Sequence, residues 1–543
     1  MRRFLSLSPR WTYLLIALAA LAGMALVAFA TSSGPGVGGD ATIYLTSAKN
    51  LLAGRGLGWT EADGSFRLLP YTPPFYPLSL SFVGLFASDL VAGARWFNVL
   101  LFGATITLTG LYLYRSTGQG WLAVIAAGLV AFSPVIIGVQ VWAMSESLFL
   151  LLCFGGLFAL VEYLYRPRPG MLIAAALLSG LAFLTRYMGA ACLLTGGLAL
   201  LVYGLRSERR LSLKALKPAF FYSVIAVLPM LVWILIDMST TGTVSSRSGQ
   251  PASAYGQRLL EMYPALESIV LFWLVPDSVT GRLPGILRAL GWLVPLAGVL
   301  GLGVVLSRRA NEENGQNQRA GILGLVLSLF IAAYLLVLAV VQVFTYPPVT
   351  LAARMLSPVH MAFLILVAGL AFFALEYLLR GKRIGAALVW LALFALLGTY
   401  VLRGGLVARR FYGTGIGYNA PEWQESETVA AAKALPANVP LISNETTALM
   451  YFADRPAYTL QEIFTDKPQT EFTVYGAGAD ESQRVFRQEN GALVLFYNTL
   501  YEDYAMYGEQ ADERIAALTE GLYPYFVSDD GAIYFYQKPS FAP

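Results

Sequence analysis

The sequence contains little charge for its length. Only 13% of its 543 residues are charged, the 37 Lys and Arg nearly balance the 33 Asp and Glu to give +4, and 57% are hydrophobic. An ordinary soluble domain carries about twice that share of charge. Together with a mean hydropathy of +0.61, the low charge excludes a disordered chain, a nucleic-acid binder with a basic face and a cytosolic enzyme of the usual kind. Most of the chain must therefore have lipid as its solvent.

Cysteine and histidine are also scarce, which limits metal and redox chemistry. Cys153 and Cys192 both lie in apolar runs, and two thiols cannot complete a zinc cluster or a disulfide framework. The only histidine, His360, lies inside a predicted membrane span. A Ser-His-Asp triad would depend on this one residue within the membrane. We expect His360 to be a buried hydrogen-bonding residue.

Eleven apolar runs are long enough to approach the length of a membrane span. A helix needs about 20 apolar residues to cross the hydrocarbon, and we took runs of that size bounded by charge, Pro or Gly. The pattern predicts a polytopic α-helical membrane protein with about 11 transmembrane helices. The runs cover approximately residues 12–31, 92–114, 121–138, 147–165, 171–186, 188–205, 218–238, 284–306, 320–343, 355–379 and 384–402.

The positions of Lys and Arg predict the orientation. They gather in alternate short connections, as at Arg115, Arg166 and Arg319, and the cytoplasmic side retains positive charge. We therefore expect a multi-pass protein of the plasma membrane with a cytoplasmic N-terminus and a C-terminus outside. Residues 28–30 could form a signal cleavage site, but the first apolar run is long for a signal core, and we favour an uncleaved span.

Three long segments fall on the outer side: the loops 32–91 and 239–283, and the tail 403–543. The tail is richer in polar residues, and its apolar runs shorten to strand length. Its pattern predicts a soluble α/β domain that can bury its own core. We expect helices near 424–434, 445–453 and 511–520, and strands near 439–443, 492–497 and 533–536.

Two acidic residues on the outer side are candidates for chemistry. Asp40 follows a glycine-rich stretch and precedes a predicted helix over 41–52 that carries Tyr44. A helix N-cap explains Asp40 as well as a functional role does. Glu146 stands where two spans meet the outer surface, a costly place for a carboxylate without water or a partner. Ser145 or Glu146 could instead cap the following span; we favour a functional role for Glu146.

Two arginines and an aromatic segment join these residues on the outer side. Arg186 lies in the short turn after the fifth span, next to Tyr187, and Arg354 lies at the start of the tenth span. A guanidinium suits phosphate or carboxylate, although each arginine could merely snorkel to lipid headgroups. The proline-rich segment Tyr71–Pro77 could form a ligand wall or an interfacial aromatic belt.

The order of these motifs resembles that of the GT-C glycosyltransferases. The similarity is to the polyprenyl-phosphate-sugar-dependent group, which includes protein O-mannosyltransferases and the aminoarabinose transferases of lipid A. It rests on the order and sidedness of several short motifs, and none of them is specific alone. The motifs are Gly39-Asp40 with Tyr44 and Gly54-Arg55-Gly56, the segment Tyr71–Pro77, Ser145–Phe149, Leu184–Tyr187, and Arg354–Pro358.

The resemblance implies a division into two domains and a set of roles. Residues 1–402 would be a transmembrane GT-C-like catalytic domain, and residues 403–543 an extracytoplasmic domain. Asp40 would be the general base of an inverting sugar transfer from a polyprenyl-phosphate donor, and Glu146 would position hydroxyl groups. Arg186 and Arg354 would stabilise the leaving phosphate, with Tyr44, Tyr71 and Tyr187 as further substrate-binding residues. The acceptor would be a protein, a lipid or a glycan.

One departure and two alternatives remain. The aminoarabinose transferases carry an acidic-basic pair before the double proline, where this chain has Tyr71-Thr72, so that subfamily does not fit. Asp40 and Glu146 could share a divalent metal ion; no cofactor follows from the sequence. The rival function is a transporter or flippase of a lipid-linked or anionic substrate, which predicts ionisable residues near the bilayer midplane and related halves. Membrane lipid is an expected partner, and nucleic acid is not.

Overall fold

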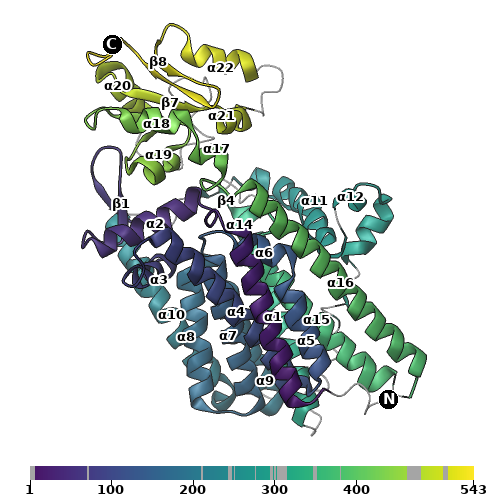
Figure 1. Cartoon of the computed structure of the whole chain (residues 1–543). Coiled ribbons are helices and arrows are strands. Elements are labelled where there is room, and N and C mark those ends of the chain that lie inside the picture. Colours follow the sequence, from purple (N-terminus) through teal and green to yellow (C-terminus); the bar gives the residue numbers. More distant parts are fainter. Residues whose placement is uncertain are drawn as a thin grey trace.

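The structure is a computed structural model in which a helical bundle carries a smaller α/β domain at one end (Figure 1). It describes residues 7–69, 72–208, 212–241, 248–249, 251–275, 277–293, 297–298, 301, 315–346, 351–379, 381–460, 479–504 and 511–542. We call the end of the bundle that carries the C-terminal domain the domain side, and the other end, where α1 begins, the opposite side.

The bundle is built from long apolar helices that are packed side by side. Their bounds are α1 Pro9–Ala30, α4 Leu90–Thr117, α5 Gly120–Ala131, α6 Pro134–Gln140, α7 Glu146–Tyr165, α8 Pro169–Thr185, α9 Ala190–Glu208, α10 Leu213–Thr241, α14 Gly315–Phe344, α15 Ser357–Phe373 and α16 Arg383–Thr414. Short 3-10 turns precede α9 (η1, Tyr187–Gly189) and α11 (η2, Ala252–Ala254), and a π-helical turn follows α15 (η3, Ala374–Leu378).

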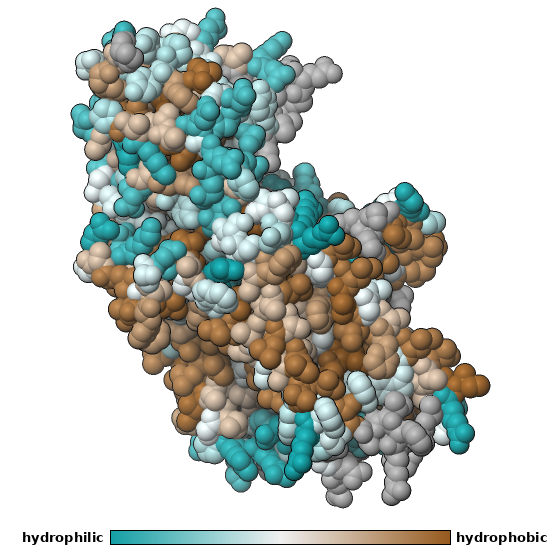
Figure 2. All heavy atoms as spheres, in the orientation of Figure 1, coloured by the Kyte–Doolittle hydropathy of each residue, from teal (hydrophilic) through white to brown (hydrophobic). Residues whose placement is uncertain are grey.

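Among the described residues, eight helices are long and apolar enough to cross a membrane, or nine if the bent pair of α5 and α6 counts as one span. The chain is therefore a multi-pass membrane protein, and on the face seen in Figure 2 a broad apolar belt crosses the bundle between two polar regions. The predicted span at 171–186 is the shorter apolar helix α8. The predicted span at 284–306 lies partly outside the described residues; its first part, 284–293, is described and is mostly helical.

The predicted span over 121–138 corresponds to two helices with a bend between them. The two helices α5 and α6 meet at an angle of 53°. Pro134 has no backbone N–H to continue the hydrogen-bond ladder of α5. Ser133 starts α6 instead, because its side chain accepts a hydrogen bond from the Ile136 amide (3.2 Å). A proline preceded by a capping serine therefore marks a break that hydropathy alone does not reveal.

The first predicted outer loop contains short elements that cover the domain side of the bundle. They are α2 Gly39–Leu52, the hairpin of β1 Gly58–Thr60 and β2 Phe66–Leu68, and α3 Phe75–Gly84. The second loop contains α11 Tyr255–Leu274 and α12 Asp277–Thr280, and β3 Ser248–Gly249 pairs with β4 Thr345–Tyr346. Figure 1 shows α2 between the bundle and the C-terminal domain.

The last bundle helix is longer than predicted. Its apolar run ends near residue 402, but α16 continues to Thr414. Arginine is a good helix former, so a change from apolar to charged residues does not end a helix. Arg403 also donates hydrogen bonds to the carbonyl oxygens of Phe272 (2.5 Å) and Trp273 (3.4 Å) in α11. Helix α16 therefore ends about a dozen residues after the end of the predicted span.

The C-terminal domain has a five-stranded mixed sheet with the order β6-β5-β7-β9-β8. The strands expected near 439–443, 492–497 and 533–536 are present as β5, β7 and β9. β5 is parallel to β6 and β7, whereas β9 is antiparallel to β7 and β8. The strands are β5 Leu441–Ser443, β6 Tyr458–Thr459, β7 Ala492–Phe496, β8 Tyr523–Val527 and β9 Gly531–Phe535; the helices are α17 Pro421–Gln424, α18 Glu427–Ala434, α19 Thr446–Ala453, α20 Ala479–Gln488, α21 Tyr497–Tyr504 and α22 Ala511–Thr519.

Several polar residues of the bundle have structural roles away from the domain side. Glu162 pairs with Arg115 (2.9 Å) and with Arg319 (3.0 Å) at the opposite side. His360 is fully buried and shares a hydrogen bond of 2.9 Å with Ser133, as expected for this residue. These contacts link α4, α7 and α14 at one end of the bundle, and α15 with the start of α6.

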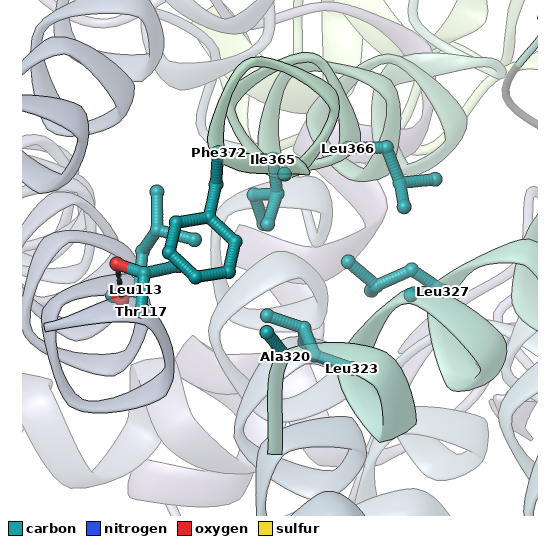
Figure 3. Close-up of a pocket in the computed structure, with 10 residues that line it drawn as sticks. Leu113, Thr117, Ala320, Leu323, Leu327, Ile365, Leu366 and Phe372 are labelled. Atoms are coloured by element: carbon teal, nitrogen blue, oxygen red, sulfur yellow. Dashed lines mark hydrogen bonds between the residues drawn. The ribbon is translucent and has the colours of Figure 1, made fainter. Parts of the chain in front are cut away.

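A cavity lies between α4, α14 and α15 near the opposite side (Figure 3). Its walls are almost entirely apolar, and the hydroxyl of Thr117 is already bonded to the carbonyl of Leu113 (2.8 Å). A cavity without free polar groups cannot orient a polar substrate. This cavity therefore does not suit a polar substrate, whereas buried polar side chains converge at the domain side.

Candidate functional site

Three chain segments far apart in the sequence meet side by side at the domain side. The Gly36 amide donates to Val141 O (2.8 Å), and the Ala143 amide donates to Gly36 O (2.9 Å). One residue further along, Val37 O accepts a hydrogen bond from the Tyr418 amide (2.8 Å). The segment with Gly36 and Val37, which lies between the other two, leads into α2, and the segment with Ala143 leads into α7. This crossing therefore brings the first turns of α2 and α7, with Asp40 and Glu146, to the same surface.

Glu146 and Arg186 form a buried ion pair at this surface. Arg186 Nη1 lies 2.8 Å from Glu146 Oε1, and the side chains are only 17% and 4% exposed. Arg186 also donates from Nη1 to Ser145 Oγ (3.0 Å). Among the described residues, neither carboxylate oxygen of Glu146 receives a well-aligned hydrogen bond. The pair thus compensates the charge of the buried Glu146 carboxylate.

Tyr44 connects α2 to this ion pair. It is buried, and its hydroxyl shares a hydrogen bond of 3.4 Å with Ser145 Oγ. Burial raises the pKa of the Tyr44 phenol, and the negative charge of Asp40 raises it further. Tyr44 therefore stays protonated at neutral pH and serves as a hydrogen-bonding group.

Asp40 is exposed in the first turn of α2. No capping hydrogen bond from its side chain is present at the start of this helix, because the N-cap residue is Gly38 and the helix begins at Gly39. Its negative charge acts on both Tyr44 and Arg186. The sequence left capping and function equally open, and the helix start shows that Asp40 is not the N-cap. A solvent-accessible carboxylate can take up a proton from a bound ligand.

Buried aromatic and amide groups connect Tyr44 to the segment that precedes α7. The rings of Tyr44 and Tyr76 meet edge to face with centroids 5.2 Å apart. The Tyr76 hydroxyl donates to Asn98 Oδ1 (3.4 Å), and Asn98 Nδ2 donates to Trp142 O (2.5 Å). This chain of contacts returns to the segment that precedes Glu146. It fixes the distance between α2 and α7 through side chains as well as through the backbone.

The remaining predicted residues lie at varying distances from this centre. Arg354 is exposed, and its Nη1 contacts Met144 Sδ (3.4 Å), two residues before Glu146. Tyr187 follows Arg186 directly and is partly buried. It interacts electrostatically with Asp237 in α10. Tyr71 lies outside the described residues. The structure thus gathers Asp40, Tyr44, Glu146 and Arg186, with Arg354 at the margin.

Sequence reasoning missed several residues that hold the site together. Ser145 belongs to the motif Ser145–Phe149, but the only role given to it was that of a possible cap; it contacts both Tyr44 and Arg186. Asn98 is a polar residue inside a predicted span, a signal that could have marked it. Tyr334, also inside a span, donates to Met355 O (2.6 Å), and Met355 Sδ contacts Arg186. These residues carry no charge, which is why a search for ionisable groups passed over them.

The site residues do not supply a complete set of ligands for a divalent ion. Within the described ranges there is no group of three or more His, Cys, Asp or Glu side chains that could hold a metal. The carboxylate of Glu146 already contacts a guanidinium, which repels a cation. Asp40 is the exposed carboxylate of the candidate site.

The fold is similar to that of several solved membrane glycosyltransferases. ArnT from Cupriavidus metallidurans, bound to undecaprenyl phosphate, superposes with a TM-score of 0.51 at 15% identity over 99% of this chain and 100% of that chain. The archaeal oligosaccharyltransferase AglB from Archaeoglobus fulgidus, in complex with an inhibitory peptide and a dolichol-phosphate, gives 0.51 at 12% identity over 98% of this chain and 75% of that chain.

A third neighbour is the arabinofuranosyltransferase AftD from Mycobacteria, with a TM-score of 0.52 at 12% identity over 99% of this chain but only 40% of that chain. No protein-family model matches the sequence, and no curated protein matches it. The fold of this chain is that of the GT-C glycosyltransferases, as the order of motifs predicted.

Proposed function

We propose that this chain is a membrane glycosyltransferase that moves a sugar from a polyprenyl-phosphate donor to an acceptor, with inversion at the anomeric carbon. The observation that carries the proposal is the grouping of Asp40, Tyr44, Glu146 and Arg186 at one end of a GT-C fold. Two solved proteins with this fold are described in complex with polyprenyl phosphates, undecaprenyl phosphate in ArnT and dolichol-phosphate in AglB.

The reaction uses the charges of the site in a simple way. An acceptor hydroxyl or amine attacks the anomeric carbon of the donor sugar and forms the new glycosidic bond. The bond between that carbon and the phosphate oxygen breaks, and its electron pair leaves with the polyprenyl phosphate. Asp40 takes the proton that the acceptor loses. A carboxylate suits this role because it is ionised at neutral pH, and Asp40 is exposed to an incoming acceptor.

Arg186 and Arg354 are proposed to stabilise the negative charge that develops on the leaving phosphate. Arg186 is held in place before the donor binds, by Glu146 at 2.8 Å and by Ser145 at 3.0 Å. Such preorganisation matters because a fixed charge needs no rearrangement during the reaction. Arg354 is exposed and is able to approach a phosphate at the membrane surface.

Glu146 has two proposed tasks. One is to orient Arg186, since the two side chains form an ion pair. The other is to accept hydrogen bonds from hydroxyl groups of a sugar or an acceptor that reaches these buried oxygens, which receive no well-aligned hydrogen bond from the described residues. Tyr44 and Tyr187 are proposed to contact the substrate beside these charges, and Tyr71 is proposed for the same role from its place in the sequence.

The charge distribution supports a topology in the plasma membrane. Arg115 and Arg319 lie together at the opposite side, and retained positive charge is typical of the cytoplasmic face. We therefore propose that the N-terminus is cytoplasmic and that the site and the C-terminal domain face outward. The acceptor would be a protein, a lipid or a glycan that reaches this face.

A direct test is to incubate the purified protein with polyprenyl phosphates that carry different pentoses and hexoses, with and without candidate acceptors. Release of polyprenyl phosphate, measured by mass spectrometry, is the expected result for at least one donor. The rival transporter or flippase would instead move a labelled donor across a liposome bilayer without breaking the sugar-phosphate bond. An intact donor that crosses the bilayer would overturn the proposal and support the rival.

A further inference from the structure

The C-terminal domain packs on α2 through α19, and a buried side chain of the connector, Asn419, contacts the segment that leads to Asp40. This residue follows α16 in the connector Gly415–Ala420 and is 8% exposed. Its Nδ2 donates to Pro35 O (2.6 Å), five residues before Asp40. Its Oδ1 accepts hydrogen bonds from Tyr451 in α19 (3.1 Å) and from Gln424 in α17 (3.3 Å). Asn419 therefore joins the C-terminal domain to the segment that leads to Asp40.

The backbone of the connector contacts the same segment. Val37 and Gly417 form a parallel bridge, and Gly36 and Trp142 form another. Gly417 has φ +55, and a side chain there would place its Cβ 2.1 Å from Val37 O. A Cβ at Gly36 would lie 2.5 Å from the ring of Trp142. The three segments are thus packed as closely as backbones permit, which only glycine allows at these two places.

Short tethers lead from this crossing to both carboxylates. Asp40 lies three residues after Val37, and Glu146 lies three residues after Ala143. Three residues span at most about 11 Å, and fewer ångströms where the chain is helical. A shift of the segment with Gly36 and Val37 therefore moves Asp40 relative to Glu146 and Arg186. Misplacing a reacting group by about 1 Å can cost about 100-fold in rate.

We propose that Asn419 is a positioning residue, through which the C-terminal domain sets the place of Asp40 relative to the Glu146–Arg186 pair. The inference rests on the proposed function only for its effect on rate. Its structural half, the restraint of residues 34–45 by a residue of the connector, is independent of any reaction. In this account the C-terminal domain completes the geometry of the site without supplying a group that touches the reacting atoms.

The test compares two Asn→Asp substitutions in the full-length protein. Asn419→Asp keeps the shape of the side chain but replaces the N–H donor to Pro35 O by an oxygen. Asn444→Asp is the matched control, because Asn444 bonds only within the C-terminal domain, to Phe496 O (3.0 Å) and Thr499 Oγ1 (2.8 Å) through Nδ2. Both variants are measured by hydrogen-deuterium exchange and by turnover of the polyprenyl-phosphate donor.

We expect Asn419→Asp to speed exchange in residues 34–45 by about tenfold, the usual weight of one lost hydrogen bond, with no change in α15. Its kcat should fall by about 10- to 100-fold while the donor KM stays within about twofold, because Arg186 and Arg354 are untouched. Asn444→Asp should leave hydrogen-deuterium exchange in residues 34–45 unchanged. It should also leave kcat unchanged. Tyr451→Phe, which removes one bond to Asn419 Oδ1 but keeps the Pro35 contact, should show a smaller effect in the same direction.

Two outcomes would overturn the inference. Exchange in residues 34–45 that is unaltered in Asn419→Asp would show that the connector does not restrain this segment. Equal effects of Asn419→Asp and Asn444→Asp would show that the C-terminal domain acts only through overall stability. If the wild-type protein turns over no lipid-linked donor, the proposed function fails, but the exchange comparison still decides whether Asn419 restrains the segment before Asp40.

Discussion

The ion pair of Glu146 and Arg186 permits a quantitative test of how the site is held together. Its N–O distance is 2.8 Å, and its side chains are 4% and 17% exposed, respectively. Removing one partner of a buried pair costs about 3–5 kcal/mol, because the other charge is left uncompensated. Glu146→Gln keeps the side-chain volume and leaves Arg186 with its contacts to Ser145 and Met355. We therefore expect a loss of about 3 kcal/mol, at the lower end of that range.

A double-mutant cycle separates this pair from its surroundings. Arg186→Gln should also destabilise the protein, whereas Glu146→Gln combined with Arg186→Gln buries no unpaired charge and should cost much less than the sum of the two. The coupling free energy should reach about 2 kcal/mol or more. Equilibrium unfolding of the four proteins in one detergent measures it. Single effects that add to within about 0.5 kcal/mol would refute the reasoning, because they would show that the two charges do not depend on each other.

Three further predictions concern other residues. Glu162→Gln should lower stability, because it breaks the pairs with Arg115 and Arg319 at the opposite side, yet leave kcat unchanged; a lost kcat would place the site elsewhere. Arg354→Gln should raise the donor KM about tenfold, a typical effect of one lost phosphate contact, and an unchanged KM would remove Arg354 from the site. Burial raises the pKa of Asp530, but the hydroxyls of Ser426, Ser528 and Thr428 lower it more, so the net shift is downward. The stability that this depressed pKa contributes is present above the unfolded pKa of about 4 and is lost as pH falls through the folded pKa. Thermal unfolding of the C-terminal domain is measured between about pH 2 and 7. The unfolding temperature should fall more steeply with acid in the wild type than in Asp530→Asn.

The sequence was sufficient for most of the membrane part because hydropathy is a local signal. The predicted runs at 92–114 and 147–165 correspond to α4 and α7, and the predicted helix over 41–52 corresponds to α2. The bend at Ser133-Pro134 was missed, since a window average does not register one proline. The extension of α16 to Thr414 was missed as well, because charge was taken as the end of a helix.

The candidate site depends in part on contacts between distant residues. The sequence singled out Asp40, Glu146 and Arg186 as candidates because charge is scarce in this chain and each lies where orientation cannot explain it. The crossing of Gly36, Trp142 and Gly417 joins residues more than 100 positions apart, and such a contact leaves no periodic pattern in the sequence. Asn419 was invisible for the same reason, although its side chain contacts the segment that precedes Asp40.

The most direct test of the central claim is donor turnover by Asp40→Asn. The substitution keeps the size of the side chain and removes the base. Asp40 is exposed, so the protein should fold with the wild-type unfolding temperature. We predict that release of polyprenyl phosphate from the sugar donor falls by at least about 100-fold, the usual weight of a general base, while the donor still binds. Wild-type turnover in a folded Asp40→Asn protein would contradict the account.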